Sequence, residues 1–173
     1  GDARKTFAPL YVSLYMNTAP FMIYFGEEVG ERGMDEEGFS GCDGRTTIFD
    51  WWSIGSIRRL RKLIASGSYE STSASALVKG GLKKEEAEIF LRFSKAIKLA
   101  AEDPAIRFGT TYDLCYCNMS SDGFDKNRHF AFLRDFEDHT VLVAANFSNR
   151  EVTMKLVIPE HAFEWMEIPI TEE

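Results

Sequence analysis

The residues best suited to chemistry lie close together between positions 43 and 52. Arg45 offers a fork of hydrogen-bond donors, and Asp43 and Asp50 offer acceptors on either side of it. Trp51 and Trp52 follow with flat apolar faces. This mixture suits a ligand rich in hydroxyl groups, such as a sugar. Two alternatives stand beside it. Arg45 could form an ion pair that pins the loop, and the two Trp side chains are favoured as buried anchors, because Trp is mostly buried in folded proteins.

Glu27 and Glu28 form an adjacent pair of carboxylates directly after an apolar stretch. Two carboxylates can serve as a general acid and a general base, but neighbouring residues of an extended chain point in opposite directions. The pair therefore cannot flank one bond, and a structural role in supporting a loop is favoured. We assign no catalytic residue in this chain.

Metal and cofactor sites are weakly indicated. The acidic residues at 35–37 could hold calcium, which prefers several oxygen ligands, but a solvated loop is favoured, and 122–125 is interpreted as a turn. Cys42, Cys115 and Cys117 and the three His residues lack the spacing of a zinc site, so buried or half-buried thiols are expected. The sequence predicts no metal and no cofactor for this chain.

The first quarter of the chain is expected to place these residues after a helix and a strand. Apolar residues at three- and four-residue spacing predict a helix over 7–15, which the segment 17–20 ends. Residues 21–25 are apolar on both alternating faces, which predicts a strand buried on both sides and ended by Gly26. The loop over 26–52 is long enough to indicate a functional segment.

Helices are expected next, and strands after them. The helices cover 57–65, whose basic residues are interpreted as a solvated face, and 83–101, which Asp103 and Pro104 end. On the second helix the buried face is expected to hold Phe90, Phe93, Ile97 and Ala100. From residue 108 the pattern changes to period two, which predicts a small antiparallel sheet or sandwich of five or six strands. These are Thr110–Cys117, His129–Phe136, Thr140–Phe147, Val152–Ile158 and Phe163–Ile170.

Composition excludes some partners. The 173 residues carry 20 Lys plus Arg against 27 Asp plus Glu, a net charge of −7, which argues against nucleic acid and anionic membranes. No apolar run is long enough to span a bilayer. Pro9 and Ser13 dilute the stretch that follows Arg4 and Lys5, so no signal peptide is predicted, and the compartment stays open between cytoplasm and periplasm or exterior.

Four landmarks resemble glycoside hydrolase family 13, the α-amylase family. Residues 19–30, Ala-Pro-Phe-Met-Ile-Tyr-Phe-Gly-Glu-Glu-Val-Gly, resemble the family's last barrel strand, and 43–51 resemble the Arg-Thr segment of the following loop. Residues 90–109 are similar to the last barrel helix and its exit. The segments 129–134 and 141–148 resemble strands of the C-terminal β domain.

This resemblance implies an α+β fragment. Residues 1–107 would be the last helix–strand–helix portion of a (β/α)8 barrel, and 108–173 a C-terminal antiparallel β domain. The family's catalytic Asp, Glu and Asp lie on earlier strands, so the whole enzyme would act on α-1,4 or α-1,6 glucosidic bonds of α-glucans by a retaining mechanism, and this chain alone would be inactive. Arg45, Asp43, Asp50 and Trp51 would contact the glucan, while Gly26, Glu28 and Trp52 would support the loop.

Two other classes of function are weighed against this one. The chain could be a non-catalytic carbohydrate-binding module or a protein-interaction domain. Calcium in the whole enzyme and hydrolysis as opposed to transfer are left open. If residues 21–25 are a barrel strand without its neighbours, the isolated chain is expected to self-associate, because an open strand edge is a template for pairing.

Overall fold

A computed structural model describes residues 3–31, 54–70 and 73–168, and in these ranges the chain is mixed α+β. Its contacts divide it into two units that interleave in sequence. The helical unit contains the described residues of Gly1–Arg4 and Met22–Ala96, and the sheet unit contains those of Lys5–Phe21 and Ile97–Glu173. The sequence predicted a division at residue 107, whereas here the first helix and residues 97–107 belong with the sheet.

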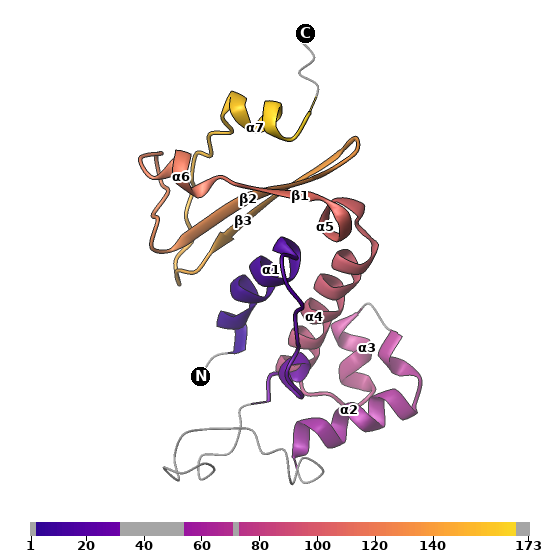
Figure 1. Cartoon of the computed structure of the whole chain (residues 1–173). Helices are drawn as coiled ribbons and strands as arrows, with labels where there is room; N and C mark the ends of the chain where they lie inside the picture. The colour runs from indigo at the N-terminus through magenta and orange to yellow at the C-terminus, as the bar shows by residue number, and fades with distance from the viewer. Residues whose placement is uncertain (1–2, 32–53, 71–72, 169–173) are drawn as a thin grey trace, which may run out of the picture. The chain divides into compact units, whose positions relative to one another are not determined.

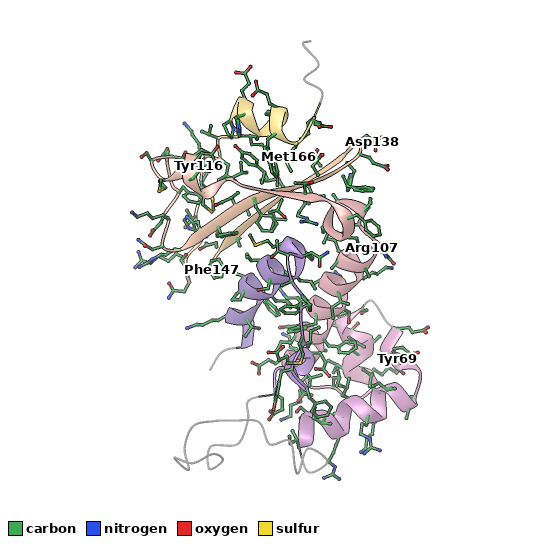
Figure 2. The ribbon with its side chains drawn as sticks, viewed as in Figure 1. Tyr69, Arg107, Tyr116, Asp138, Phe147 and Met166 are labelled. Carbon is green, nitrogen blue, oxygen red and sulfur yellow. The ribbon has the colours of Figure 1, made fainter. Side chains whose placement is uncertain are left out.

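The sheet unit is built on three antiparallel strands in the order β1-β2-β3. These are β1 (Thr110–Asp113), β2 (His129–Phe136) and β3 (His139–Asn146). Thr110 pairs with Asp135 across β1 and β2, and His129 pairs with Asn146 across β2 and β3. Glu137 has a φ of 56° in the turn between β2 and β3, beside Asp138, which Figure 2 labels.

Helices cover both faces of this sheet (Figure 1). The helix α7 (Glu160–Trp165) covers one face, where Ala162 and the following Met166 join Leu133 in a buried apolar cluster. The helix α1 (Phe7–Met16) contacts β2 and β3 on the other face. Adjacent residues of a pleated strand point to opposite faces of the sheet, so Leu133 lies on the face that α7 covers and Arg134 on the other face. Two short helices, α5 (Pro104–Phe108) and α6 (Cys115–Asn118), flank β1.

Arg134 ties the helices on its side of the sheet to the strands. Its side chain is only 3% exposed, yet it carries a guanidinium charge. Nε donates to the carbonyl of Ala105 at 3.1 Å, Nη2 to that of Ile106 at 2.8 Å and Nη1 to that of Met16 at 3.0 Å. The last carbonyls of a helix have no partner within the helix, and their partial negative charge attracts a cation. Arg134 thus serves the ends of α1 and α5 together.

Two further features bring the ends of α1 and α5 together with β2. Asn17, in the left-handed conformation after α1, donates from Nδ2 to the carbonyls of Ile106 at 3.1 Å and Arg107 at 3.0 Å. Gly109 follows α5, where a Cβ atom would lie 2.2 Å from the carbonyl oxygen of Ala105 and 2.6 Å from that of Asp135. Only glycine allows this approach.

The helical unit packs around a core of aliphatic side chains. Its α-helices are α2 (Gly55–Ala65), α3 (Ala74–Lys79) and the part of α4 (Lys84–Glu102) up to Ala96. The short 3-10 helices η2 (Glu27–Val29) and η3 (Ser68–Glu70) also belong to this unit. The 3-10 helix η1 (Ala3–Thr6) spans the boundary between the two units in the sequence. The core contains Val29, Ile57, Leu60, Leu63, Leu77, Leu82 and Ala87. The predicted helices over 57–65 and 83–101 are confirmed.

Local details differ from these helix predictions. The helix α2 begins at Gly55, two residues before the predicted start, and Ile54 precedes it without a side-chain cap. On α4 the buried positions are Glu86, Ala87, Ile89, Phe93 and Ala96, so of the predicted face only Phe93 is fully buried. The buried face is therefore rotated, and it includes a carboxylate.

The predicted strand over 21–25 is wrong for this chain. These residues form neither helix nor strand, and Met22 is 83% exposed; Phe21, Tyr24 and Phe25 are exposed as well. The described residues contain a sheet only in the other unit, so the ladder that would bury this segment on both sides is not present here. An apolar pattern predicts burial, but neighbouring strands have to supply it.

The prediction of five or six strands is also wrong, because the described residues form three. The strand over 129–136 is confirmed, and 140–147 is confirmed with a shift of one residue. The predicted strand 110–117 ends at Asp113. The Asp113 side chain accepts a hydrogen bond at 2.7 Å from the amide of Cys115, the first residue of α6. Residues 152–158 run without a ladder, and Val157 bonds to the side chain of Asn118.

The described part of the predicted strand 163–170 forms no strand, and its first three residues, 163–165, are the end of a helix. Pro159 precedes the helix α7, and its fixed φ suits a helix start. Ala162 and Met166 lie four residues apart and face the sheet together, a helical spacing. The alternation of apolar residues in this stretch indicated a strand, but packing on the sheet favours the helix.

Replacing Arg134 with Met is expected to destabilise the sheet unit strongly. The substitution keeps the bulk of the side chain but removes one hydrogen-bond donor from each of the carbonyls of Ala105, Ile106 and Met16, which together costs about 2–4 kcal/mol. Urea unfolding followed by circular dichroism measures the loss. Arg150→Met, at an exposed position, is the control and should change the free energy of unfolding by less than about 0.5 kcal/mol. Equal stabilities of the two variants would contradict the role of Arg134.

Candidate functional site

A tight turn at Gly26–Glu31 begins the candidate site. Gly26 has a φ of 92°, and a Cβ atom there would lie 2.8 Å from Cβ of Glu31, so glycine is required on two grounds. The Glu31 amide donates to the carbonyl of Gly26 at 3.0 Å. Glu28 folds back and accepts from the amide of Gly26 at 3.0 Å, and Glu27 accepts from that of Tyr24 at 3.1 Å. Both carboxylates therefore hold the turn itself.

A pocket of about 550 Å³ opens in the helical unit beside this turn. It is lined by Val29, Gly30, Glu31, Ile54, Gly55, Ser56, Arg59, Lys83, Glu85, Glu86 and Ile89. Val29 and Ile57 anchor the turn and α2 to the apolar core, each 1% exposed, so the elements around the pocket are firmly packed. The lining mixes apolar side chains with both signs of charge and a hydroxyl group.

An ion pair between Arg59 and Glu86 forms one wall of the pocket. The guanidinium donates from Nε to Oε2 at 2.8 Å and from Nη2 to Oε1 at 2.5 Å, a two-pronged contact between α2 and α4. The Lys83 amide donates to Oε2 at 2.9 Å. Burial acts to raise the pKa of the Glu86 carboxyl, but the hydrogen bonds from Arg59 and Lys83 outweigh it, and the pKa falls below its usual value of 4.5. The pair raises the pKa of Arg59.

The Glu86 carboxylate is suited to holding the wall of the pocket rather than to transferring protons. Glu86 is ionised at neutral pH and its oxygens already accept three hydrogen bonds, so it is a poor general acid or base. The guanidinium of Arg59, the ammonium of Lys83 and the hydroxyl of Ser56 supply donors at the lining. Fixed charges of both signs with donors and acceptors suit a neutral, hydroxyl-rich ligand better than an ion of one sign.

The structure describes two of the predicted site residues. Gly26 and Glu28 lie in the turn beside the pocket and are joined by the hydrogen bond from the Gly26 amide to the Glu28 carboxylate. Arg45, Asp43, Asp50, Trp51 and Trp52 lie outside the described residues, as do the acidic residues 35–37 and Cys42. The residues on either side of that stretch, Glu31 and Ile54, both line the pocket.

Sequence reasoning missed the charged wall of the pocket. It interpreted Arg59 as part of a solvated face together with Arg58, Arg61 and Lys62, yet Arg59 is half-buried and paired. The signal was on α4, where Glu86 shares a helical face with Ile89 and Phe93 at spacings of three and seven. A carboxylate in an apolar stripe needs a buried partner, and a basic residue on a neighbouring helix is the natural one.

The two described thiols lie in the other unit and are unreactive in character. Cys115 and Cys117 are half-buried, as expected, but on the short helix α6 rather than on a strand. Burial raises the pKa of Cys115 to about 11 and raises that of Cys117. Within the described ranges no three His, Cys, Asp or Glu side chains gather as metal ligands do, and no helix is long and apolar enough to cross a bilayer.

Comparison with protein-family models, with curated proteins and with solved structures finds no match to this chain. A functional assignment therefore rests on the geometry of the pocket and on the landmarks in the sequence.

Glu86→Gln tests whether the ion pair holds the wall of the pocket. A carboxyl whose pKa is lowered by folding stabilises the protein above its unfolded pKa, here 4.5, and that stabilisation is lost as the pH falls through the folded value. We expect the substitution to lower the free energy of unfolding by about 1–3 kcal/mol at pH 7 and to flatten its decline toward acid.

The matched control is Glu88→Gln, two residues further along α4 and exposed. It should leave both the stability at pH 7 and the acid dependence close to those of the parent chain. Urea unfolding at a series of pH values from 7 to 3 supplies the comparison. A Glu86→Gln variant that follows the parent curve throughout would show that the pair contributes nothing to folding.

Proposed function

We propose that this chain is the C-terminal part of an α-amylase-family glycoside hydrolase acting on α-glucans, and that its pocket is part of the glucan-contacting surface. The sequence landmarks at 19–30, 43–51, 90–109, 129–134 and 141–148 are the basis for the family. In the whole enzyme the retaining chemistry belongs to carboxylates outside this chain. The residues of this chain bind and position the glucan.

The placement of Glu31 and Ile54 carries the proposal. Both line the pocket and together they flank the stretch that contains Arg45, Asp43, Asp50 and Trp51. The stretch contributes a guanidinium, two carboxylates and an indole, and the pocket contributes hydrogen-bonding groups of both kinds; together these groups fit a polyhydroxylated ligand. Glu28 fixes the turn from which the stretch departs, in keeping with a supporting role.

The exposure of the apolar segment 21–25 also supports the proposal. Phe21, Met22, Tyr24 and Phe25 are large apolar side chains, and burying each would stabilise a fold by about 1.5–3 kcal/mol. Four exposed side chains of this kind within five residues indicate a surface that another part of the protein covers. In the whole enzyme, further parts of the barrel would cover these side chains.

The coding DNA upstream of Gly1 tests the proposal most simply. The same reading frame should continue upstream for about 250 residues and encode seven alternating strand and helix patterns, the part of a (β/α)8 barrel that precedes its last strand. An Asp, a Glu and an Asp are expected at the ends of its fourth, fifth and seventh strands. A start codon a few codons before Gly1, with no upstream barrel in frame, would overturn the assignment.

The chain alone should not hydrolyse starch, pullulan or nitrophenyl α-glucosides. No covalent glycosyl intermediate can form without a nucleophilic carboxylate and an acid flanking one bond, and Glu27 and Glu28 are engaged in their own turn. Reducing-sugar and nitrophenol release should equal the buffer blank. Turnover above the blank that disappears in Glu27→Gln or Glu28→Gln would refute this assignment of roles.

A further inference from the structure

A cluster of aromatic side chains in the sheet unit has no part in the proposed hydrolase function. Tyr112 lies at its centre, on β1, and is 7% exposed. Tyr116 on α6, labelled in Figure 2, and His161 and Trp165 on α7 surround it. We call these four residues the aromatic cluster. No sequence pattern predicts it, because its members are up to 53 positions apart, from Tyr112 to Trp165.

Tyr112 fixes the two outer rings of the cluster. Its ring centroid lies 6.2 Å from that of Tyr116 and 5.8 Å from that of Trp165, with ring planes inclined at 57° and 59°. Such tilted arrangements are favourable for aromatic pairs. The hydroxyl of Tyr112 also hydrogen-bonds to that of Tyr116 at 2.5 Å and to Nδ1 of His161 at 3.1 Å. The outer rings are thus held by contacts on their inner side.

The outer rings remain open to solvent although they are held in place. Tyr116 and Trp165 are each 52% exposed, and His161 is exposed beside them. A half-exposed indole and a half-exposed phenol, presented from two helices on a buried hub, lose little entropy when a ligand binds to them. The hydrogen bond to Tyr116, together with burial, raises the pKa of Tyr112 to about 12, so the Tyr112 hydroxyl stays protonated at physiological pH.

The chemistry of the aromatic cluster selects a neutral sugar. An exposed aromatic ring stacks on the C–H face of a pyranose, and the Tyr116 hydroxyl and the His161 imidazole can bond to the ring's hydroxyl groups. Glu160 and Glu164 lie exposed on the same helix as Trp165 and disfavour an anionic ligand. From these observations we propose that the aromatic cluster is a second, non-catalytic site that binds an α-glucan; the choice of glucan rests on the proposed hydrolase function.

Fluorescence of Trp165 measures this binding directly. The chain has three Trp residues, so Trp51→Phe together with Trp52→Phe leaves Trp165 as the only indole. Adding maltoheptaose to this variant should change the emission of Trp165 saturably. Tyr116→Ala in the same background should weaken the apparent Kd by about tenfold, the effect expected from the loss of one aromatic contact. Phe147→Ala, at an exposed aromatic residue outside the cluster, is the matched control and should leave the Kd unchanged.

Each outcome of this experiment bears on one proposal. An emission that does not respond to maltoheptaose, or a Kd that is the same in Tyr116→Ala and Phe147→Ala, overturns the second site, provided that circular dichroism shows the variants folded. A response that requires Tyr116 while the upstream DNA encodes no barrel supports the second site and refutes the hydrolase. Concentration-dependent emission without sugar, with dimers in light scattering, would mean that the cluster contacts a second copy instead and would overturn the proposal.

Discussion

The charge of Arg134 is buried in the sheet unit, and much of the local architecture follows from satisfying it. A guanidinium that is removed from water needs hydrogen-bond acceptors for its N–H groups, and here the carbonyl groups at two helix ends provide them. The carbonyls of Met16, Ala105 and Ile106 all point to one side chain of β2. Burial lowers the pKa of Arg134, which is the direction that desolvation of a cation produces. The ends of α1 and α5 are thus fixed against the strand that carries the charge.

The helical unit solves the same physical problem in a different way. Arg59 meets a carboxylate, Glu86, rather than carbonyl groups, and the pair is partly open to the pocket. An ion pair at a pocket wall keeps strong hydrogen-bonding groups fixed without leaving either charge unpaired. Because α2 and α4 each contribute one partner, the ion pair joins the two helices at the wall of the pocket. Support of this kind is what a binding surface needs.

The sequence predicted local patterns well where one element decides them. The helices at 57–65 and 83–101 and the strand at 129–136 have strong periodicity, and all three are present. The predictions failed where contacts with residues distant in the sequence determine the local structure. Residues 21–25 are apolar on both faces, yet the described chain supplies no strands beside them. The segment that begins at Phe163 alternates like a strand, but packing of Ala162 and Met166 on the sheet makes it a helix.

The candidate site was predicted in part. Gly26 and Glu28 were singled out for a supporting role, and they build the turn beside the pocket. The pocket itself depends on Glu86 and Arg59, which are 27 positions apart and meet only when α2 and α4 pack. A buried carboxylate in a helical stripe shows that a partner must exist, but only the fold identifies it.

Chemical-shift mapping of the pocket tests its proposed role as a glucan contact most directly. In a titration of the ¹⁵N-labelled chain with maltoheptaose, the amide resonances of Gly30, Gly55 and Ser56, which line the pocket, should shift progressively and saturate, while the same concentration of glycerol should leave them in place. If these three resonances do not move at concentrations of maltoheptaose that saturate any other part of the chain, or at the highest soluble concentration, the pocket is not a glucan-contacting surface.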